Sequence, residues 1–143
     1  MGCGYSGDCI KILNGHNKEV HSIVKYSNEC VLSGSEDETI RLWNINSGEC
    51  FKTFTGHLKS VYCVEILSNE RILSGSDDKT IKIWNIKTGD CLQNLKGHTD
   101  SVSCIKVLSE ESILSGSYDG KIRIWRLKKT SALKQVMLTQ MHL

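Results

Sequence analysis

Short runs in which apolar and polar residues alternate follow one another from residue 5 to residue 127. Such alternation is typical of β-strands that bury one face, and these runs show no helical periodicity. Short polar turns separate the runs, so we expect neighbouring strands to pair antiparallel in small sheets. The expected strands are 20–26, 30–35, 40–45, 61–67, 71–76, 81–86, 102–108, 112–117 and 122–127, with a fourth type of strand at 7–14 and in the runs that end at Phe54 and Leu95.

One stretch of this pattern recurs at a fixed spacing. The residues of 33–43 return at 74–84 and at 115–125, a step of 41 residues each time, and a Gly-His pair precedes every copy. A sheet of four short strands cannot bury both of its faces alone, whereas stacked neighbours bury them for one another. The repetition therefore predicts an array of small antiparallel sheets.

A Gly-His pair, then Ser-Gly-Ser-x-Asp, then Trp at this period resembles the WD40 repeat, whose units build β-propellers. The resemblance covers residues 7–127. The family's Trp-Asp pair departs here, because Asn follows Trp in two copies and Arg follows it in the third; the turn Asp is present in all three. The resemblance implies an all-β fold of about three four-stranded antiparallel blades, in an incomplete ring or in part of a larger or oligomeric propeller.

The resemblance divides the chain into three repeats with short segments at either end. Propellers close with about 4–8 blades, so three are too few for a ring. Three alternatives stay open: the chain is part of a larger propeller, two copies assemble into six blades, or the open array is a stable monomer. The expected segments are a lead at 1–6, a strand of a preceding blade at 7–14, repeats at 15–55, 56–96 and 97–137, and a tail at 138–143.

The end of the third repeat is degenerate and allows two interpretations. Residues 132–138 could supply the last strand of the third blade, in competition with residues 7–14 of another chain. The same region could instead form a frayed helix. Its apolar side would carry Leu133, Val136, Met137 and Met141.

A hydrogen-bonded network inside each blade is also implied by the resemblance. The Asp accepts from the imidazole, the imidazole accepts from the first Ser of Ser-Gly-Ser, and that Ser accepts from the indole N–H. A buried network in which every polar group is paired favours a single packing. Its residues are His16, Ser33, Asp37 and Trp43, then His57, Ser74, Asp78 and Trp84, then His98, Ser115, Asp119 and Trp125.

Ser, His and Asp together can also form the triad of a hydrolase. A triad occurs once per site, with an exposed nucleophile beside an oxyanion hole. This set occurs three times at equivalent positions and always with Trp. We therefore expect a structural network, with no catalytic residue, no enzyme activity, no metal site and no cofactor.

Propellers bind partners mostly through the loops that precede the first strand of each blade and the turns that follow the second. Apart from the network aspartates, this loop face carries four carboxylates against Lys18 and Lys59, so it leans acidic. That disfavours a phosphopeptide receptor and favours a basic peptide, with Tyr118 and Leu58 as apolar contacts. The alternative is that these are solvated loop residues. The candidate partner-binding residues are Glu19, Glu36, Leu58, Ser60, Asp77, Asp100, Ser101 and Tyr118.

We therefore expect a non-catalytic scaffold for protein–protein interaction. The alternative function is a substrate-recognition or regulatory segment of a multidomain protein, such as a ubiquitin ligase adaptor or a signalling subunit. A net charge of +2 is too small to indicate a nucleic-acid partner. No apolar run reaches the ~20 residues that span a bilayer, and residues 1–14 lack a secretion signal, so we expect a cytoplasmic or nuclear protein.

Two further features concern cysteine and lipid chemistry. Residues 1–6 match the N-myristoylation pattern, with Gly2 as the acceptor and Cys3 as a second lipid site; a chance match is the alternative. Membrane binding is expected only with that lipidation.

Most of the seven cysteines recur with the repeat and no Cys-x-x-Cys pair exists, which favours buried or half-buried reduced thiols over a disulfide framework or a metal site.

Overall fold

The computed structural model describes residues 2 and 4–128, and in that part of the chain eleven strands form three sheets without a helix. The first sheet has the order β1 (Val20–Lys25), β2 (Cys30–Ser35), β3 (Ile40–Asn44), β4 (Cys50–Phe54). The second has β5 (Val61–Ile66), β6 (Arg71–Ser76), β7 (Ile81–Asn85), β8 (Cys91–Leu95). The third has β9 (Val102–Ser109), β10 (Ser112–Ser117) and β11 (Ile122–Arg126).

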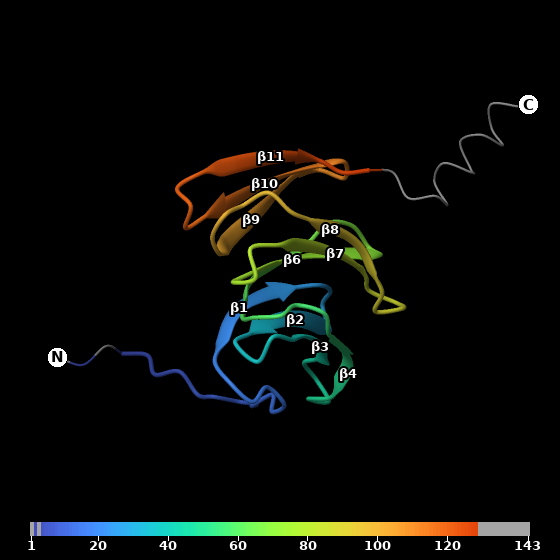
Figure 1. The fold of residues 1–143 in the computed structure, drawn as a ribbon. Helices are drawn as coiled ribbons and strands as arrows, with labels where there is room; N and C mark the ends of the chain where they lie inside the picture. The colour runs from blue at the N-terminus through green and yellow to red at the C-terminus, as the bar shows by residue number, and fades with distance from the viewer. Residues whose placement is uncertain (1, 3, 129–143) are drawn as a thin grey trace, which may run out of the picture.

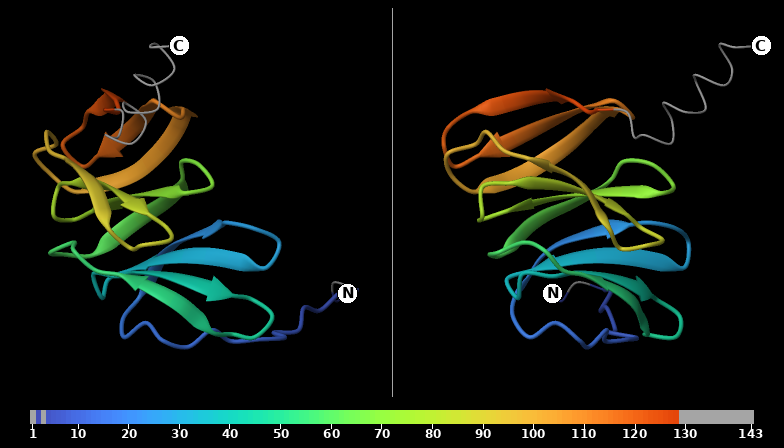
Figure 2. Two further views of the ribbon diagram at one scale, coloured as in Figure 1. Left: turned by 90° about the vertical axis from the view of Figure 1, so that its right-hand side faces the viewer. Right: turned by 45° about the vertical axis from the view of Figure 1, so that its right-hand side comes forward.

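All neighbouring strands pair antiparallel, and the three sheets follow one another in an open arc (Figures 1 and 2). The predicted all-β class and the array of antiparallel blades are thereby confirmed. The strands follow the expected ranges within a residue or so. β1 ends one residue early because the N–H groups of Tyr26 and Ser27 both turn to the Cys30 carbonyl. β3 ends at Asn44, whose side-chain oxygen accepts from the next turn.

Residues 7–14 form no strand pairing in the structure. They still lie against the first sheet as the preceding strand would: the Lys11 ammonium donates to the Asn46 carbonyl. The equivalent Lys52 of β4 donates to Lys87, and Gln93 of β8 donates to Lys128 at 2.8 Å. The assignment of 7–14 to a preceding blade, like the other segment boundaries, stays a prediction. The proposed last strand at 132–138 and the tail at 138–143 lie outside the described residues.

The hydrophobic core lies between the sheets rather than within one. One cluster joins residues such as Leu32, Ile40 and Phe54 of the first sheet to Val61 and Val64 of the second. A second cluster does the same between the second and third sheets. This is the stacking that the repeat predicted, since each sheet covers the apolar face of the next.

Several cysteines differ from the prediction of buried or half-buried thiols. Cys63 is buried between the second and third sheets, whereas Cys9, Cys91 and Cys104 are exposed. Cys104 is exposed because no further sheet covers the third one among the described residues. The cysteines of that part of the chain are all free thiols, and Cys3 lies outside it. No described helix is long and apolar enough to cross a membrane.

Candidate functional site

Each blade holds the four-residue chain of side chains that the sequence predicts. In the second blade His57 Nδ1 lies 2.7 Å from Asp78 Oδ2, His57 Nε2 lies 2.6 Å from Ser74 Oγ, and the Trp84 indole N–H donates to Ser74 Oγ at 2.8 Å. The two other blades repeat these distances within 0.1 Å. An indole only donates and a carboxylate only accepts, so each imidazole donates from Nδ1 to the Asp and each Ser Oγ accepts the indole N–H, while Nε2 and Ser Oγ share the remaining hydrogen bond.

The aspartates of the network are held as carboxylates. Burial alone would raise the pKa of Asp37, but hydrogen bonds from Thr39, His16 and the Asn17 N–H lower it to about 2. The corresponding hydrogen bonds lower the pKa values of Asp78 and Asp119 as well, against the same effect of burial. A carboxylate with several donors keeps its charge in the fold.

The second Ser of each Ser-Gly-Ser has a different role from the first. Ser76 Oγ accepts from the Asp78 N–H at 3.0 Å and donates to the Lys59 carbonyl at 3.2 Å, which ties the turn after β6 to the loop before β5. The Gly of each Gly-His pair passes directly over the Trp ring. A Cβ built on Gly56 would lie 3.0 Å from the Trp84 ring, and Gly56 has a φ of 151°. The pair is thus Gly-His because the backbone approaches the indole too closely for a side chain.

The network is poorly suited to catalysis. All three network serines are buried: the exposed fraction is 5% for Ser33, 0% for Ser74 and 1% for Ser115. Each hydroxyl is engaged on both sides, by the imidazole and by the indole. A nucleophile must be exposed to its substrate. The geometry therefore supports a structural role for these side chains.

Aromatic and acidic side chains lie close together on the loop face. His21 and Tyr62, at equivalent positions of β1 and β5, have ring centroids 5.2 Å apart, and Tyr62 lies 6.3 Å from the ring of Tyr118. Burial raises the pKa of the Tyr62 hydroxyl, and the nearby charges of Asp77, Glu36 and Asp100 raise it further. Four predicted residues, Glu36, Asp77, Asp100 and Tyr118, thus lie around one tyrosine that sequence reasoning missed.

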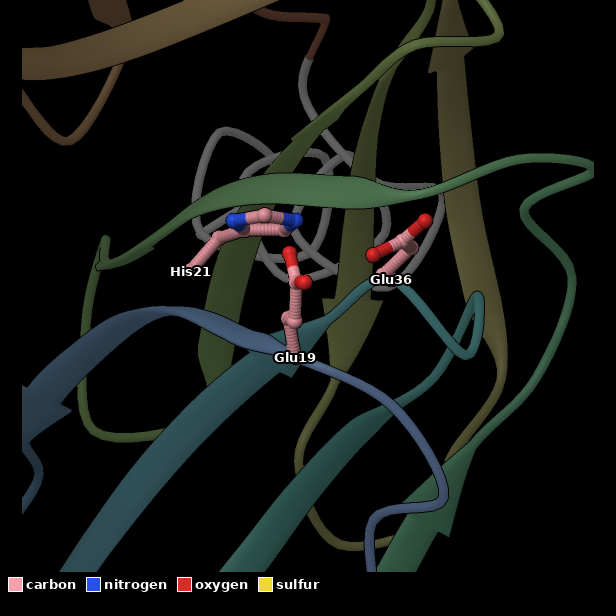
Figure 3. Close-up of side chains that lie close together, drawn as sticks. All are labelled: Glu19, His21 and Glu36. Carbon is pink, nitrogen blue, oxygen red and sulfur yellow. The ribbon is translucent and has the colours of Figure 1, made fainter.

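Glu19, His21 and Glu36 also lie close together, with Glu19 between the other two as Figure 3 shows, and one ligand atom from each residue lies within 4.8 Å of the others. The Glu36 N–H donates to the Glu19 carbonyl at 2.8 Å, which joins the turn after β2 to the start of β1. Carboxylate oxygens and an imidazole nitrogen are ligand types found in divalent metal sites, and exposed acidic groups of this kind are also common without a metal ion. We call the residues of this region the acidic–aromatic surface: Glu19, His21, Glu36, Tyr62, Asp77, Asp100 and Tyr118.

The other predicted partner-binding residues have different surroundings. Ser101 is buried, and its hydroxyl donates to Asp77. Ser60 contributes its carbonyl to the Asp77 N–H at 2.9 Å. Leu58 is 79% exposed and borders a separate hollow that also includes Lys79, Lys82 and Lys96. Position 21 varies among the repeats as His21, Tyr62 and Ser103; this variation at an otherwise regular position was the one signal that could have indicated the missed aromatic residues.

None of the four carboxylates of the acidic–aromatic surface takes part in a salt bridge with another described residue. The ion pairs in that part of the chain join Lys87 to Glu70, Lys106 to Glu65, and the network histidines to their aspartates. Asp77 accepts the Ser101 hydroxyl and forms no salt bridge with any residue that the structure describes. The surface therefore carries carboxylates outside any salt bridge among the described residues, next to two aromatic rings.

Comparison with known proteins bears on the fold and its family. The family model described as WD domain, G-beta repeat matches residues 7–44, 48–85 and 89–126. Among solved structures, the chain is similar to the WD40 β-propeller domain of Doa1, with 29% sequence identity and a TM-score of 0.75. The match covers 85% of this chain and 40% of that one. A search of curated proteins found no match.

Proposed function

The chain belongs to the WD40 family, and on that premise we propose that it is a non-catalytic interaction scaffold whose acidic–aromatic surface binds a basic peptide. The observation that carries the proposal is the group of four carboxylates without salt bridges among the described residues: Glu36, Asp77 and Asp100 near Tyr62, and Glu19 near His21 and Glu36. A Lys or Arg side chain supplies the missing charge and can also stack on a tyrosine ring.

The chemistry of the surface also argues against other ligands. A phosphorylated or acidic peptide would bring negative charge next to carboxylates, and like charges at an interface cost affinity. The neighbouring rings of Tyr62 and Tyr118 offer the flat apolar contact that binding surfaces often use as anchors.

We also propose that the chain acts in the cytoplasm or the nucleus, the location that we expect from the sequence.

A second candidate function is a substrate-recognition or regulatory segment of a larger protein, such as a ligase adaptor or a signalling subunit. The chain spans 40% of the matched Doa1 chain, and its blades form an open arc. Chemistry on another domain or on a bound partner would then act on what this surface holds. The two candidates share the surface and differ in what lies beside it.

A binding titration tests the surface. We expect a fluorescein-labelled Arg-rich peptide to bind with an affinity that falls as salt is added, because exposed charges are screened. The double change Glu36→Gln with Asp100→Asn should weaken binding about twofold to thirtyfold, since each exposed ion pair contributes about 0.2–1 kcal/mol. Tyr118→Ala, at a residue that is 69% exposed, should weaken it as well without disturbing the core.

The matched control neutralises two carboxylates elsewhere. Glu29→Gln with Glu110→Gln removes the same charge from exposed turns after β1 and β9, so it leaves the acidic–aromatic surface intact. It should preserve peptide affinity. Equal retention of acidic, phosphorylated and Arg-rich peptides would contradict the proposal. So would equal effects of the two double variants, because the contribution would then come from overall charge alone.

A further inference from the structure

Large apolar side chains are exposed at the two ends of the array. On the first sheet, Val20, Ile23 and Ile45 are exposed by 47%, 69% and 38%. We call this side the leading face. On the third sheet, the exposed fractions are 55% for Leu108, 77% for Ile122 and 75% for Ile124. We call this side the trailing face.

The residues at the same repeat positions are buried or, for Tyr26 and Leu42 of the first sheet, partly buried wherever two sheets meet. Positions equivalent to the leading face are exposed by at most 5%: Val61, Val64 and Ile86 in the second sheet, and Val102, Ile105 and Leu127 in the third. Positions equivalent to the trailing face are exposed by at most 6% in the second sheet: Leu67, Ile81 and Ile83. The chain therefore carries both halves of an interface that it already forms twice within itself.

We propose that the leading face of one copy packs on the trailing face of a second copy, so that two chains close into one six-bladed ring. The two surfaces differ, so the contact is heterologous, and such contacts close into a ring or continue into a filament. Six blades lie within the usual range for propellers. Both faces of both copies are then covered.

A glycine on each trailing face shows how closely the next sheet fits. A Cβ built on Gly34 would lie 2.8 Å from Val61 Cγ1, and one built on Gly75 would lie 2.7 Å from Val102 Cγ1. At Gly116 the neighbour within 4 Å is Cys104 Sγ, of the same sheet. Val20 of a second copy holds the repeat position of Val61 and Val102, so it occupies the corresponding place above Gly116.

The second copy also supplies a strand. β3 and β7 each pair on both edges, whereas β11 pairs with β10 alone among the described residues. Residues 7–14 have the Gly-acid-Cys start that precedes β4 and β8, and they already lie against their own first sheet in the place of such a strand. The registers Ile81↔Leu95 and Trp84↔Cys91 then set Leu13 of the second copy opposite Ile122 and Cys9 opposite Trp125.

One residue departs from the internal interfaces. Lys25 stands on the leading face where Ile66 and Val107 pack in the other sheets. Its position at the end of β1 is at the rim of the face. A lysine there can lay its aliphatic stem on the partner and keep its ammonium in water. Val20 and Ile23, at the centre of the face, are apolar like the residues at the same repeat positions in the other sheets.

The test is the mass of the full chain in solution, measured by light scattering after size exclusion over a range of concentrations. The expected mass is twice 16.0 kDa. Ile23→Lys and Ile122→Glu should each give monomers, because either change places a charge in the centre of both contacts of the ring. An equimolar mixture of the two variants should recover the dimer, since one contact is then native and the other pairs Lys with Glu.

Two controls separate this interface from general stickiness. Leu58→Glu changes an equally exposed apolar residue away from both faces and should leave the mass at the dimer value. Deleting residues 2–13 removes the exchanged strand and should weaken the dimer. A wild-type chain that stays at 16.0 kDa throughout overturns the proposal, as does a series of larger species, which would mean an open filament. Failure of the mixture to recover the dimer overturns the proposed pairing of faces.

Discussion

Removing one hydroxyl from the middle blade, by Ser74→Ala, tests how far the buried network stabilises the fold. Ser74 Oγ accepts the Trp84 N–H at 2.8 Å and lies 2.6 Å from His57 Nε2, in a residue with no exposed surface. Alanine leaves both nitrogens without a partner, and each unpaired buried polar group costs about 1–3 kcal/mol. Because effects on neighbouring groups are not additive, we expect the free energy of unfolding to fall by about 2–4 kcal/mol.

Urea titration followed by tryptophan fluorescence measures this loss. The midpoint should move to lower urea with an unchanged slope, since the surface exposed on unfolding is nearly the same. Ser76→Ala is the matched control, because Ser76 is as buried as Ser74 but its partners, the Asp78 N–H and the Lys59 carbonyl, lie near the surface. The control should cost about 0.5–1.5 kcal/mol. If Ser74→Ala costs no more than the control, the network does not stabilise the blade as argued.

Three further predictions follow from the same contacts. The pKa of Asp37 is about 2 in the fold against a usual 3.8, so its ionisation favours the folded state above about pH 4. This contribution should be lost as the pH falls towards 2, which an acid titration followed by circular dichroism would show. A stability that does not change over this range would contradict the prediction. Gly75→Ala should destabilise the chain by about 1–3 kcal/mol in urea titration by overpacking the contact with the third sheet, whereas Gly7→Ala, where no atom lies within 4 Å, should have no effect. Burial raises the pKa of the Cys63 thiol to about 12. An aromatic disulfide reagent should therefore label exposed Cys91 readily and Cys63 only after unfolding, and equal labelling rates in the folded chain would refute the assigned burial.

Much of the fold could be predicted from the sequence because the repeat reports it three times. Alternation located the strands, and the fixed positions of His57, Ser74, Asp78 and Trp84 located the side chains that the structure places within hydrogen-bonding distance. Repetition also separated these residues from a catalytic triad. What the repeat keeps constant is what holds a blade together, so this part of the structure was accessible from one chain.

The remainder depends on contacts that the repeat does not encode. His21 and Tyr62 share one repeat position but differ in type, so periodicity gave no reason to group them. Tyr62 meets Tyr118 where the second sheet packs against the third. Cys63 and Cys104 share a position too, yet one is buried and the other exposed, because a neighbouring sheet covers only the first. Burial in this fold depends on which sheet lies beside a residue as well as on the residue itself.

A repeat unit and a sheet begin at different strands, and this affects how the number of blades can change. Two of the matched repeats begin with the last strand of one sheet and continue with three strands of the next: residues 48–85 contain β4 and then β5 to β7, and residues 89–126 contain β8 and then β9 to β11. The corresponding assignment of residues 7–14 stays a prediction. A duplication or deletion of one unit inserts or removes a blade and leaves both terminal surfaces as they were. Tandem duplication can therefore alter the number of blades, because the junctions are formed by equivalent repeat positions whose residues are mostly apolar in each copy.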